Sequence, residues 1–287
     1  MNTIPLCEPY LKGEESKLLN QCIKTNWLSE SGKFVSLFES SVKEFTNSKY
    51  STAFINATSA LHLALKVVGC EKNNEVIVPT LTFVAPINAV KYNDCYPIFM
   101  DCDDFYNIDQ EKCIKFLKEE TLYKNGKSYN KKTKRIIKAI IIVHVWGNAA
   151  KFDNLYLLCK KRNIKIIEDA SESLGSYYAK GRFKGKHTGT IGDIGCISFN
   201  TNKIITCGSG GMVITRNKKY FNKLKYLSTQ AKDDSFYYIH NEIGYNYRLN
   251  NLNASIGLAQ IKNIKKILGK KKLINNYYRN KINLIKG

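Results

Sequence analysis

The chain has 287 residues, 44% of them hydrophobic and 11% aromatic, which excludes a disordered protein and allows one large domain or two smaller ones. Its 45 lysines and arginines against 24 acidic residues give a net charge of +21, but arginine is scarce and the lysines are scattered, so we expect no nucleic-acid partner. No run of about 18 apolar residues occurs, so we expect no membrane span.

Short apolar segments rich in β-branched residues predict strands that are buried on both faces. These segments are residues 52–56, 75–79, 96–101, 139–145, 164–169, 195–199 and 211–215. Amphipathic stretches at 58–68 and 151–162 predict helices between them. Strands that alternate with helices predict an α/β domain with a mostly parallel sheet, in which ligands bind at the carboxyl ends of the strands.

Two regions depart from this alternation. Residues 118–138 are polar and rich in lysine, and we interpret them as an exposed insertion with a hairpin around Asn125-Gly126. From about residue 252 onward the sequence predicts a long helix followed by further basic, helical sequence. We therefore divide the chain into a large α/β domain, 1–250, and a linking helix with the start of a further domain, 251–287.

A lysine lies in a tight turn between two predicted strands. The strand that ends at Phe199 is followed by a polar turn that contains Lys203, and then by glycines 208, 210 and 211 before the next strand. A lysine held at the sheet edge could lose its proton through desolvation and form a Schiff base. The alternative is an ordinary solvated lysine in a lysine-rich protein.

Other predicted strands are followed by residues that suit a planar, phosphorylated cofactor. Asp169 ends a buried strand, where a carboxylate could pair with a pyridine nitrogen or cap a helix. Thr58 and Ser59 open a helix, where they could bind a phosphate or act as a plain N-cap. Phe83 follows a strand and a proline, where it could stack on a ring or belong to the core.

The cysteines and histidines indicate neither disulfides nor a metal site. The nine cysteines form no C-x-x-C pair and several lie in apolar runs, which is typical of reduced thiols in a cytoplasmic protein. The four histidines show no ligand spacing, so we predict no metal. The first ten residues show no secretory signal, which also favours a cytoplasmic location.

The order of these motifs resembles one family, the pyridoxal-phosphate-dependent sugar aminotransferases of the DegT/StrS type. The resemblance rests on IPLCEPYLKGEE, NATSALHLAL, VIVPTLTFVAPINA, HVWGNAAKFD, IEDASESLGSYY, GKHTGTIGDIGCISFNTNKIITCGSGGMVIT, TQAKDD and HNEIGYNYRLNNLNASIGLAQ. It implies the fold type I architecture of such transferases, a three-layer α/β/α domain with a mostly parallel seven-stranded sheet. Within the family the chain looks most like the branch that aminates nucleotide-linked 4-keto-6-deoxy sugars for legionaminic acid or bacillosamine.

The resemblance implies roles for residues around pyridoxal 5′-phosphate. Lys203 matches the Schiff-base lysine and acid/base, Asp169 the partner of the pyridine nitrogen, and Glu172 the position near the phenolic oxygen. The remaining cofactor contacts that it implies are phosphate binding by Thr58, Ser59 and Ser198, ring stacking by Phe83, and contact of Asn246 with the phosphate in a neighbouring subunit. The last contact implies a homodimer with shared active sites.

The resemblance also implies the substrate and the reaction. Trp27, Leu28 and Ser29 match the segment that lines the sugar-nucleotide pocket. The implied reaction is a ping-pong transamination, in which glutamate gives its amino group to the cofactor and the C4 ketone of a nucleotide-linked sugar, such as an N-acetylated hexosamine derivative, then receives it. Such an amino sugar would serve the biosynthesis of a cell-surface polysaccharide or glycan.

Two alternatives stay open at this point. Members of the family continue for about another hundred residues as a small C-terminal domain, so we expect that this domain is truncated here and that the chain could be a catalytically impaired, cofactor-binding remnant. The other alternative is a basic nucleic-acid-binding protein, for which the net charge is the only support.

Overall fold

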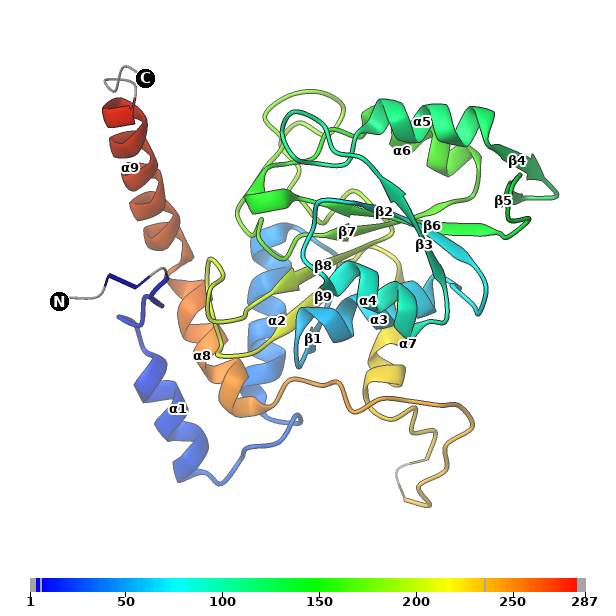
Figure 1. The fold of residues 1–287 in the computed structure, drawn as a ribbon. Coiled ribbons are helices and arrows are strands. Elements are labelled where there is room, and N and C mark those ends of the chain that lie inside the picture. Colours follow the sequence, from blue (N-terminus) through cyan, green and yellow to red (C-terminus); the bar gives the residue numbers. More distant parts are fainter. Residues whose placement is uncertain (1–3, 6, 235, 283–287) are drawn as a thin grey trace.

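The computed structural model describes residues 4–5, 7–234 and 236–282. In this part of the chain a seven-stranded sheet has the order β1-β9-β8-β7-β6-β2-β3 (Figure 1). Its strands are β1 (Tyr50–Phe54), β2 (Glu75–Pro79), β3 (Tyr96–Met100), β6 (Ile137–Val143), β7 (Lys165–Asp169), β8 (Ile194–Ser198) and β9 (Gly211–Thr215). Strand β9 is antiparallel to both neighbours, and the other neighbouring pairs are parallel. The mostly parallel α/β sheet is therefore confirmed.

Helices cover both faces of the sheet and give the three layers that the family resemblance implies (Figure 1). The helices are α1 (Glu15–Lys24), α2 (Lys33–Thr46), α3 (Ala57–Val67), α4 (Ala85–Tyr92), α5 (Gln110–Glu119), α6 (Asp153–Lys161), α7 (Lys218–Ser228), α8 (Asn251–Lys262) and α9 (Ile264–Ile282). Helices α3, α4 and α7 pack on one face. Helices α5 and α6 cover one half of the other face, and α2 and α8 cover its second half.

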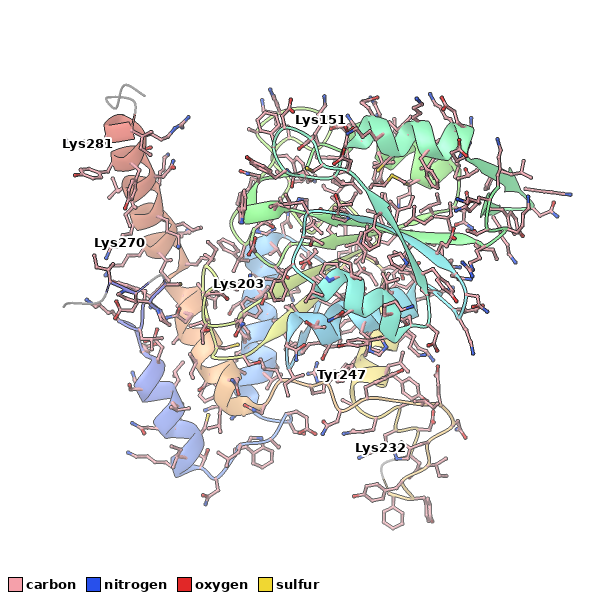
Figure 2. All side chains as sticks on the ribbon, in the orientation of Figure 1. Lys151, Lys203, Lys232, Tyr247, Lys270 and Lys281 are labelled. Atoms are coloured by element: carbon pink, nitrogen blue, oxygen red, sulfur yellow. The ribbon has the colours of Figure 1, made fainter. Side chains whose placement is uncertain are left out.

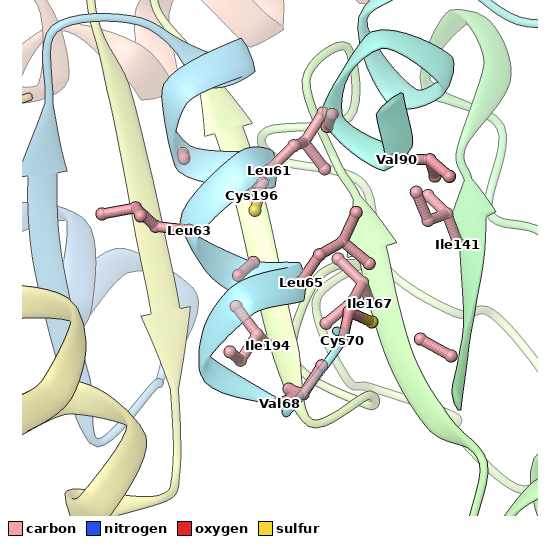
Figure 3. Packing of buried hydrophobic residues seen from close by; sticks show 14 of the residues in the cluster. Leu61, Leu63, Leu65, Val68, Cys70, Val90, Ile141, Ile167, Ile194 and Cys196 are labelled. Atoms are coloured by element: carbon pink, nitrogen blue, oxygen red, sulfur yellow. The ribbon is translucent and has the colours of Figure 1, made fainter. Parts of the chain in front are cut away.

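Alternation along the central strands explains this packing. In β7, Ile167 points into the cluster under α3 and Ile166 points into the cluster under α6, and both are fully buried. Helix α3 lies against its strands through Leu61 and Leu65 (Figure 3). Because its leucines lock it onto the middle of the sheet, the beginning of α3 is fixed at the carboxyl ends of the strands.

One expectation about the strands is wrong. Strand β3 was expected to be buried on both faces, but it is the edge of the sheet and Tyr96 and Phe99 are 38% and 55% exposed. An apolar, β-branched run does not by itself distinguish a central strand from an edge strand. Pro97 carries the distinguishing signal, because a residue without an N–H is tolerated at an edge.

The expected hairpin in the polar insertion is confirmed. Strands β4 (Thr121–Lys124) and β5 (Lys127–Asn130) pair antiparallel across Asn125 and Gly126. Both turn residues have positive φ, +51° and +74°, as a two-residue type I′ turn requires. The hairpin packs beside α5 and β6, away from the carboxyl ends of the sheet (Figure 1).

The last helix leaves the body of the domain. Helix α8 packs against α1 and α2, the chain turns at Asn263, and α9 then projects outward (Figure 1). In α9 only Ile264 and Ile267 are buried. The long helix predicted from residue 252 is thus two helices. Residues 283–287 of the predicted 251–287 segment lie outside the described residues, and the domain boundary at 250 stays a prediction.

The described residues contain no helix that is long and apolar enough to cross a bilayer. They also hold no group of three or more His, Cys, Asp or Glu side chains arranged for a metal ion. All nine cysteines are free, and seven of them are buried.

Candidate active site

A cavity of about 490 Å³ opens at the carboxyl ends of β6, β7 and β8, beside the beginning of α3. Its size and position are typical of a small-molecule site in an α/β sheet. Six of the residues predicted from the sequence line it: Thr58, Phe83, Asp169, Glu172, Ser198 and Lys203. They come from four different connections, which the sheet topology brings to one edge.

Lys203 lies in the turn after β8, and its side chain is 17% exposed. Its Nζ donates a hydrogen bond to Oε1 of Glu172 at 3.0 Å, and Oε2 of Glu172 accepts from the backbone N–H of Trp146 at 3.0 Å. Labelled lysines such as Lys151, Lys232 and Lys270 lie far apart on the outside of the molecule (Figure 2). Lys203 is thus distinguished by position, in a cavity with a carboxylate beside its amine.

Asp169 is a buried carboxylate at the end of β7. Its Oδ1 accepts the backbone N–H of Ser171 at 3.0 Å. Burial raises the pKa of Asp169, although the bonds from Ser171 and the nearby His144 and Lys203 act in the opposite direction. A carboxylate in this state gains from a cationic partner that would restore its charge.

Glu168, the preceding residue, is also fully buried but has more partners. Burial acts to raise the pKa of Glu168, but the hydrogen bond and charge of His144 and the N–H groups of Gly192 and Gly189 outweigh it, and the pKa is lowered. His144 Nε2 lies 2.9 Å from Oε2 of Glu168, and the N–H of Ile191 donates to Oε1 at 2.7 Å. Through these hydrogen bonds, Glu168 connects strand β7 to the end of β6 and to the loop at 189–192.

The beginning of α3 forms one wall of the cavity. Asn56 is the N-cap, and its side chain accepts from the N–H of Ser59 at 2.8 Å. The N–H groups of Ala57 and Thr58 have no acceptor among the described residues. Gly211, at the start of β9, touches this turn so closely that a Cβ on it would lie 2.5 Å from the Asn56 carbonyl. The glycine therefore allows β9 to reach the helix start.

Five predicted site residues do not line the cavity of this chain. Asn246 is exposed and pairs with Thr229 in an isolated bridge. Trp27, Leu28 and Ser29 lie in the exposed loop after α1, where their carbonyls accept from Asn251 at the start of α8. Ser59 borders the cavity wall, but it is buried and its N–H is engaged by Asn56. A single chain therefore brings six of the eight predicted cofactor and catalytic residues to one cavity, but not Ser59, Asn246 or the Trp27–Ser29 segment.

Two further residues of the site, His144 and Trp146, were not predicted from the sequence. His144 is fully buried, lines the cavity and follows strand β6 just as Asp169 ends β7. Trp146 follows it, with φ of +51°, and is 67% exposed in the cavity lining. The position after a predicted strand could have identified His144. The positive φ of Trp146 has no signal in the sequence, because bulky residues rarely adopt it.

Residues 9–287 match the DegT/DnrJ/EryC1/StrS aminotransferase family. The chain belongs to this family. It is an aminotransferase with pyridoxal 5′-phosphate as cofactor, and its fold is the type I fold of those enzymes. The family resemblance found in the sequence is thereby confirmed.

Several named proteins are similar to this aminotransferase. It is 38% identical over 283 residues to GDP-perosamine synthase of Escherichia coli O157:H7, covering 99% of this chain and 72% of that protein. It is 34% identical over 249 residues to a UDP-4-amino-4,6-dideoxy-N-acetyl-beta-L-altrosamine transaminase of Campylobacter jejuni, covering 86% of this chain and 61% of that protein. The solved structure of Helicobacter pylori PseC, an aminotransferase involved in the biosynthesis of pseudoaminic acid, superposes with a TM-score of 0.79 at 29% identity, covering 92% of this chain and 66% of that one.

The residues of the cavity fit pyridoxal phosphate. The free N–H groups of Ala57 and Thr58 at the positive end of α3 suit a phosphate. Asp169, with its raised pKa, suits a protonated ring nitrogen. Phe83 is 79% exposed in the cavity lining, which leaves its ring face free to stack.

Proposed function

We propose that this aminotransferase moves the amino group of glutamate to the C4 ketone of a nucleotide-linked 4-keto-6-deoxy sugar. The observation that carries the proposal is the Lys203–Glu172 pair, which shares one cavity with Asp169 and the beginning of α3. The names of the relatives support an amino-sugar product, since one prints a 4-amino-4,6-dideoxy sugar and others print perosamine. Such sugars suit the biosynthesis of a surface polysaccharide or glycan.

The finer identity of the substrate stays a prediction. Relatives are named for GDP-linked as well as UDP-linked sugars, so either nucleotide fits the comparisons. The Campylobacter relative's name supports an N-acetylated hexosamine derivative. The legionaminic acid or bacillosamine branch, the glutamate donor and the cytoplasmic location likewise stay predictions.

In the proposed mechanism the chain's residues first hold the cofactor. Thr58 with the N–H groups at the start of α3, and Ser198 at the end of β8, bind the phosphate. Phe83 stacks on the ring. Asp169 keeps the ring nitrogen protonated, and that positive charge in turn stabilises the buried carboxylate. Bound pyridoxal phosphate supplies an electron sink for the carbon that loses a proton.

Lys203 and Glu172 then handle the proton. The Nζ of Lys203 becomes a base when it loses its own proton, and Glu172 at 3.0 Å is placed to hold the ammonium form. Because Lys203 is only 17% exposed, its amine is largely protected from water. We assign Lys203 the transfer of the proton at the reacting carbon and Glu172 the orientation of its amine.

We also propose a homodimer in which Asn246 and the Trp27–Ser29 segment serve the partner's cavity. Two facts support it: these residues are exposed, and they lie outside the cavity of their own chain. Sedimentation of the full chain should give a dimer, and Asn246→Ala should weaken cofactor binding. A monomer with full cofactor affinity would contradict this assembly.

Lys203→Ala tests the proposed function. Wild-type protein mixed with pyridoxal phosphate should show a new absorbance band and a borohydride-trapped adduct at Lys203, and both should be lost in the variant. Lys151→Ala, at a lysine on the outside of the molecule, is the matched control and should behave as wild type. Mass spectrometry should then detect amine transfer from glutamate to a nucleotide-linked 4-keto-6-deoxyhexose.

Two results would contradict the proposal or favour its alternatives. Cofactor binding without any glutamate reaction would indicate the cofactor-binding remnant, which the intact set of cavity residues does not favour. Absence of both the band and the adduct in wild-type protein would overturn the assignment of Lys203. A steep, salt-dependent affinity for DNA would instead support a nucleic-acid binder.

A further inference from the structure

Trp146 stands in a strained turn at the cavity. It follows β6 in the short segment Val145–Gly147, with φ +51° and ψ +24°. A bulky side chain rarely adopts this left-handed conformation. Where one does, the surrounding structure fixes the backbone and the position tends to belong to a functional site.

Hydrogen bonds from two other loops fix this turn. The side-chain oxygen of Asn107, a residue that is only 2% exposed, accepts the N–H of Val145 at 3.1 Å. Glu172 accepts the N–H of Trp146 at 3.0 Å. The backbone is therefore held in the strained conformation by contacts that do not involve the indole ring.

The indole ring itself is presented to the cavity. It is 67% exposed and lines the cavity wall, so packing of the core does not require it. The ring of Tyr106 meets it edge to face, with centroids 5.2 Å apart and planes at 63°. Tyr106 also has a positive φ, +65°, in a loop where Asp103 accepts the N–H groups of Phe105 and Asn107. The loop of Tyr106 and the turn of Trp146, both with positive φ and both held by hydrogen bonds, thus place these two aromatic rings in contact.

We propose that Trp146, braced by Tyr106, is the platform on which the hexose ring of the amino-acceptor substrate lies. The inference deepens the proposed function and rests on it. The carboxylate of Glu172 accepts both the backbone N–H of Trp146 and the Nζ of Lys203, each at 3.0 Å. Trp146 is therefore held in the same cavity as the amine that handles the proton. The part of the substrate that reaches this amine is the ring that carries the ketone, whereas the nucleotide lies further out.

The chemistry of a 6-deoxyhexose fits such a platform. Its ring carries C–H groups on one face and a methyl group at C6, and these apolar groups pack well on the face of an aromatic ring. The indole also donates one N–H, which suits a sugar hydroxyl. Because both loops are fixed before the substrate arrives, the platform costs little ordering on binding.

Calorimetric titration of the full chain loaded with cofactor tests the platform. The probes are GDP-mannose and UDP-N-acetylglucosamine, each compared with GDP or UDP alone. We expect Trp146→Gly to raise the Kd of the hexose probe that wild type binds by about tenfold, the order that ring stacking provides, and to leave the Kd of the nucleotide alone unchanged. Trp146→Phe keeps a ring and should restore most of the affinity.

Two controls separate this role from a structural one. Glycine relieves the positive φ, so Trp146→Gly should fold with an equal or higher Tm. Phe105→Ala removes an exposed aromatic ring of the neighbouring loop that does not line the cavity, and it should bind both kinds of probe as wild type does.

An unchanged Kd for the hexose probe in Trp146→Gly overturns the proposal. The proposal is also overturned if wild-type protein binds neither hexose probe more tightly than the corresponding nucleotide, GDP or UDP. Wild-type protein that binds a hexose probe through Trp146 but performs no glutamate reaction contradicts the proposed function and leaves the platform standing.

Discussion

Glu168 and Asp169 are neighbours on strand β7, and both are fully buried, yet their surroundings differ. Glu168 faces the loop at 189–192, where backbone N–H groups and His144 surround its two oxygens. Asp169 faces the cavity with one backbone N–H on its side chain. Their pKa values accordingly shift in opposite directions, lowered for Glu168 and raised for Asp169.

The difference separates a structural acid from a functional one. A buried carboxylate whose oxygens are all engaged stabilises the fold and has no capacity left for a ligand. A buried carboxylate that still has free acceptor sites and lies beside a cavity is destabilised until a cationic ligand binds. The two sides of one strand thus serve different purposes, and variants can test each side by itself.

The largest effect should come from Glu168→Gln. The glutamine amide would place an N–H₂ group against N–H donors such as that of Gly192, and it would leave His144 without its charged partner. We expect the free energy of unfolding to fall by about 3–5 kcal/mol, as for a broken buried pair. Urea unfolding measures it, with the exposed Glu120→Gln as control. A loss below about 1 kcal/mol would contradict the structural role.

Asp169→Asn should have the opposite effect: activity should fall while the free energy of unfolding does not. Asparagine cannot stabilise a protonated ring nitrogen, so kcat/KM of the glutamate half-reaction should fall about 10²–10³-fold, as on loss of one electrostatic partner. The free energy of unfolding without cofactor should stay equal or rise, because burial raises the pKa of Asp169 and disfavours its charge. Stopped-flow absorbance and urea unfolding test both parts. A destabilised but active variant would refute the comparison.

Mild acid should lower the free energy of unfolding of the whole chain by a smaller amount. Burial lowers the pKa of His187, in the loop beside Glu168, and of His62 to about 4, whereas an unfolded histidine titrates near 6.5. Unfolding therefore takes up protons between these values, and the free energy of unfolding falls as the pH falls from 6.5 to 4. Each histidine should contribute a loss of about 1 kcal/mol at pH 5.5.

Urea midpoints at pH 7.5, 6.5 and 5.5 measure this loss. His240→Gln, at an exposed histidine, is the control and should keep the same pH profile as wild type. Glu168 stays charged in this window because its pKa is lowered. A midpoint that does not change with pH would contradict the lowered pKa of the buried histidines.

Local patterns predicted most of the fold. The strand segments and the hairpin at Asn125-Gly126 follow from β-branched runs and turn residues, because these preferences act over a few residues. The edge position of β3 depends on pairing between distant segments, which an apolar run alone does not specify. The break at Asn263 between α8 and α9 was missed because asparagine is tolerated within helical sequence.

The residues of the candidate site were predictable where a reactive or polar side chain directly follows a predicted strand. Lys203, Asp169 and Thr58 each come just after or at the end of a predicted strand, and the topology brings them to one cavity. His144 also lies at the end of a predicted strand, but its spacing from the other histidines carries no signal of a site. The role of Trp146 depends on a backbone strain that Asn107 and Glu172 impose from two distant loops.

The antiparallel strand β9 has a consequence for how the chain folds. It lies between β1 and β8, so Phe54 at the end of β1 pairs with Gly211, more than 150 residues later. Pairing over such a separation is slow, and β1 has no neighbour in the sheet until residues 211–215 have been synthesised. The start of α3 and the turn of Lys203 therefore meet late. During synthesis, the ability to bind the cofactor should appear abruptly, once β9 has joined the sheet.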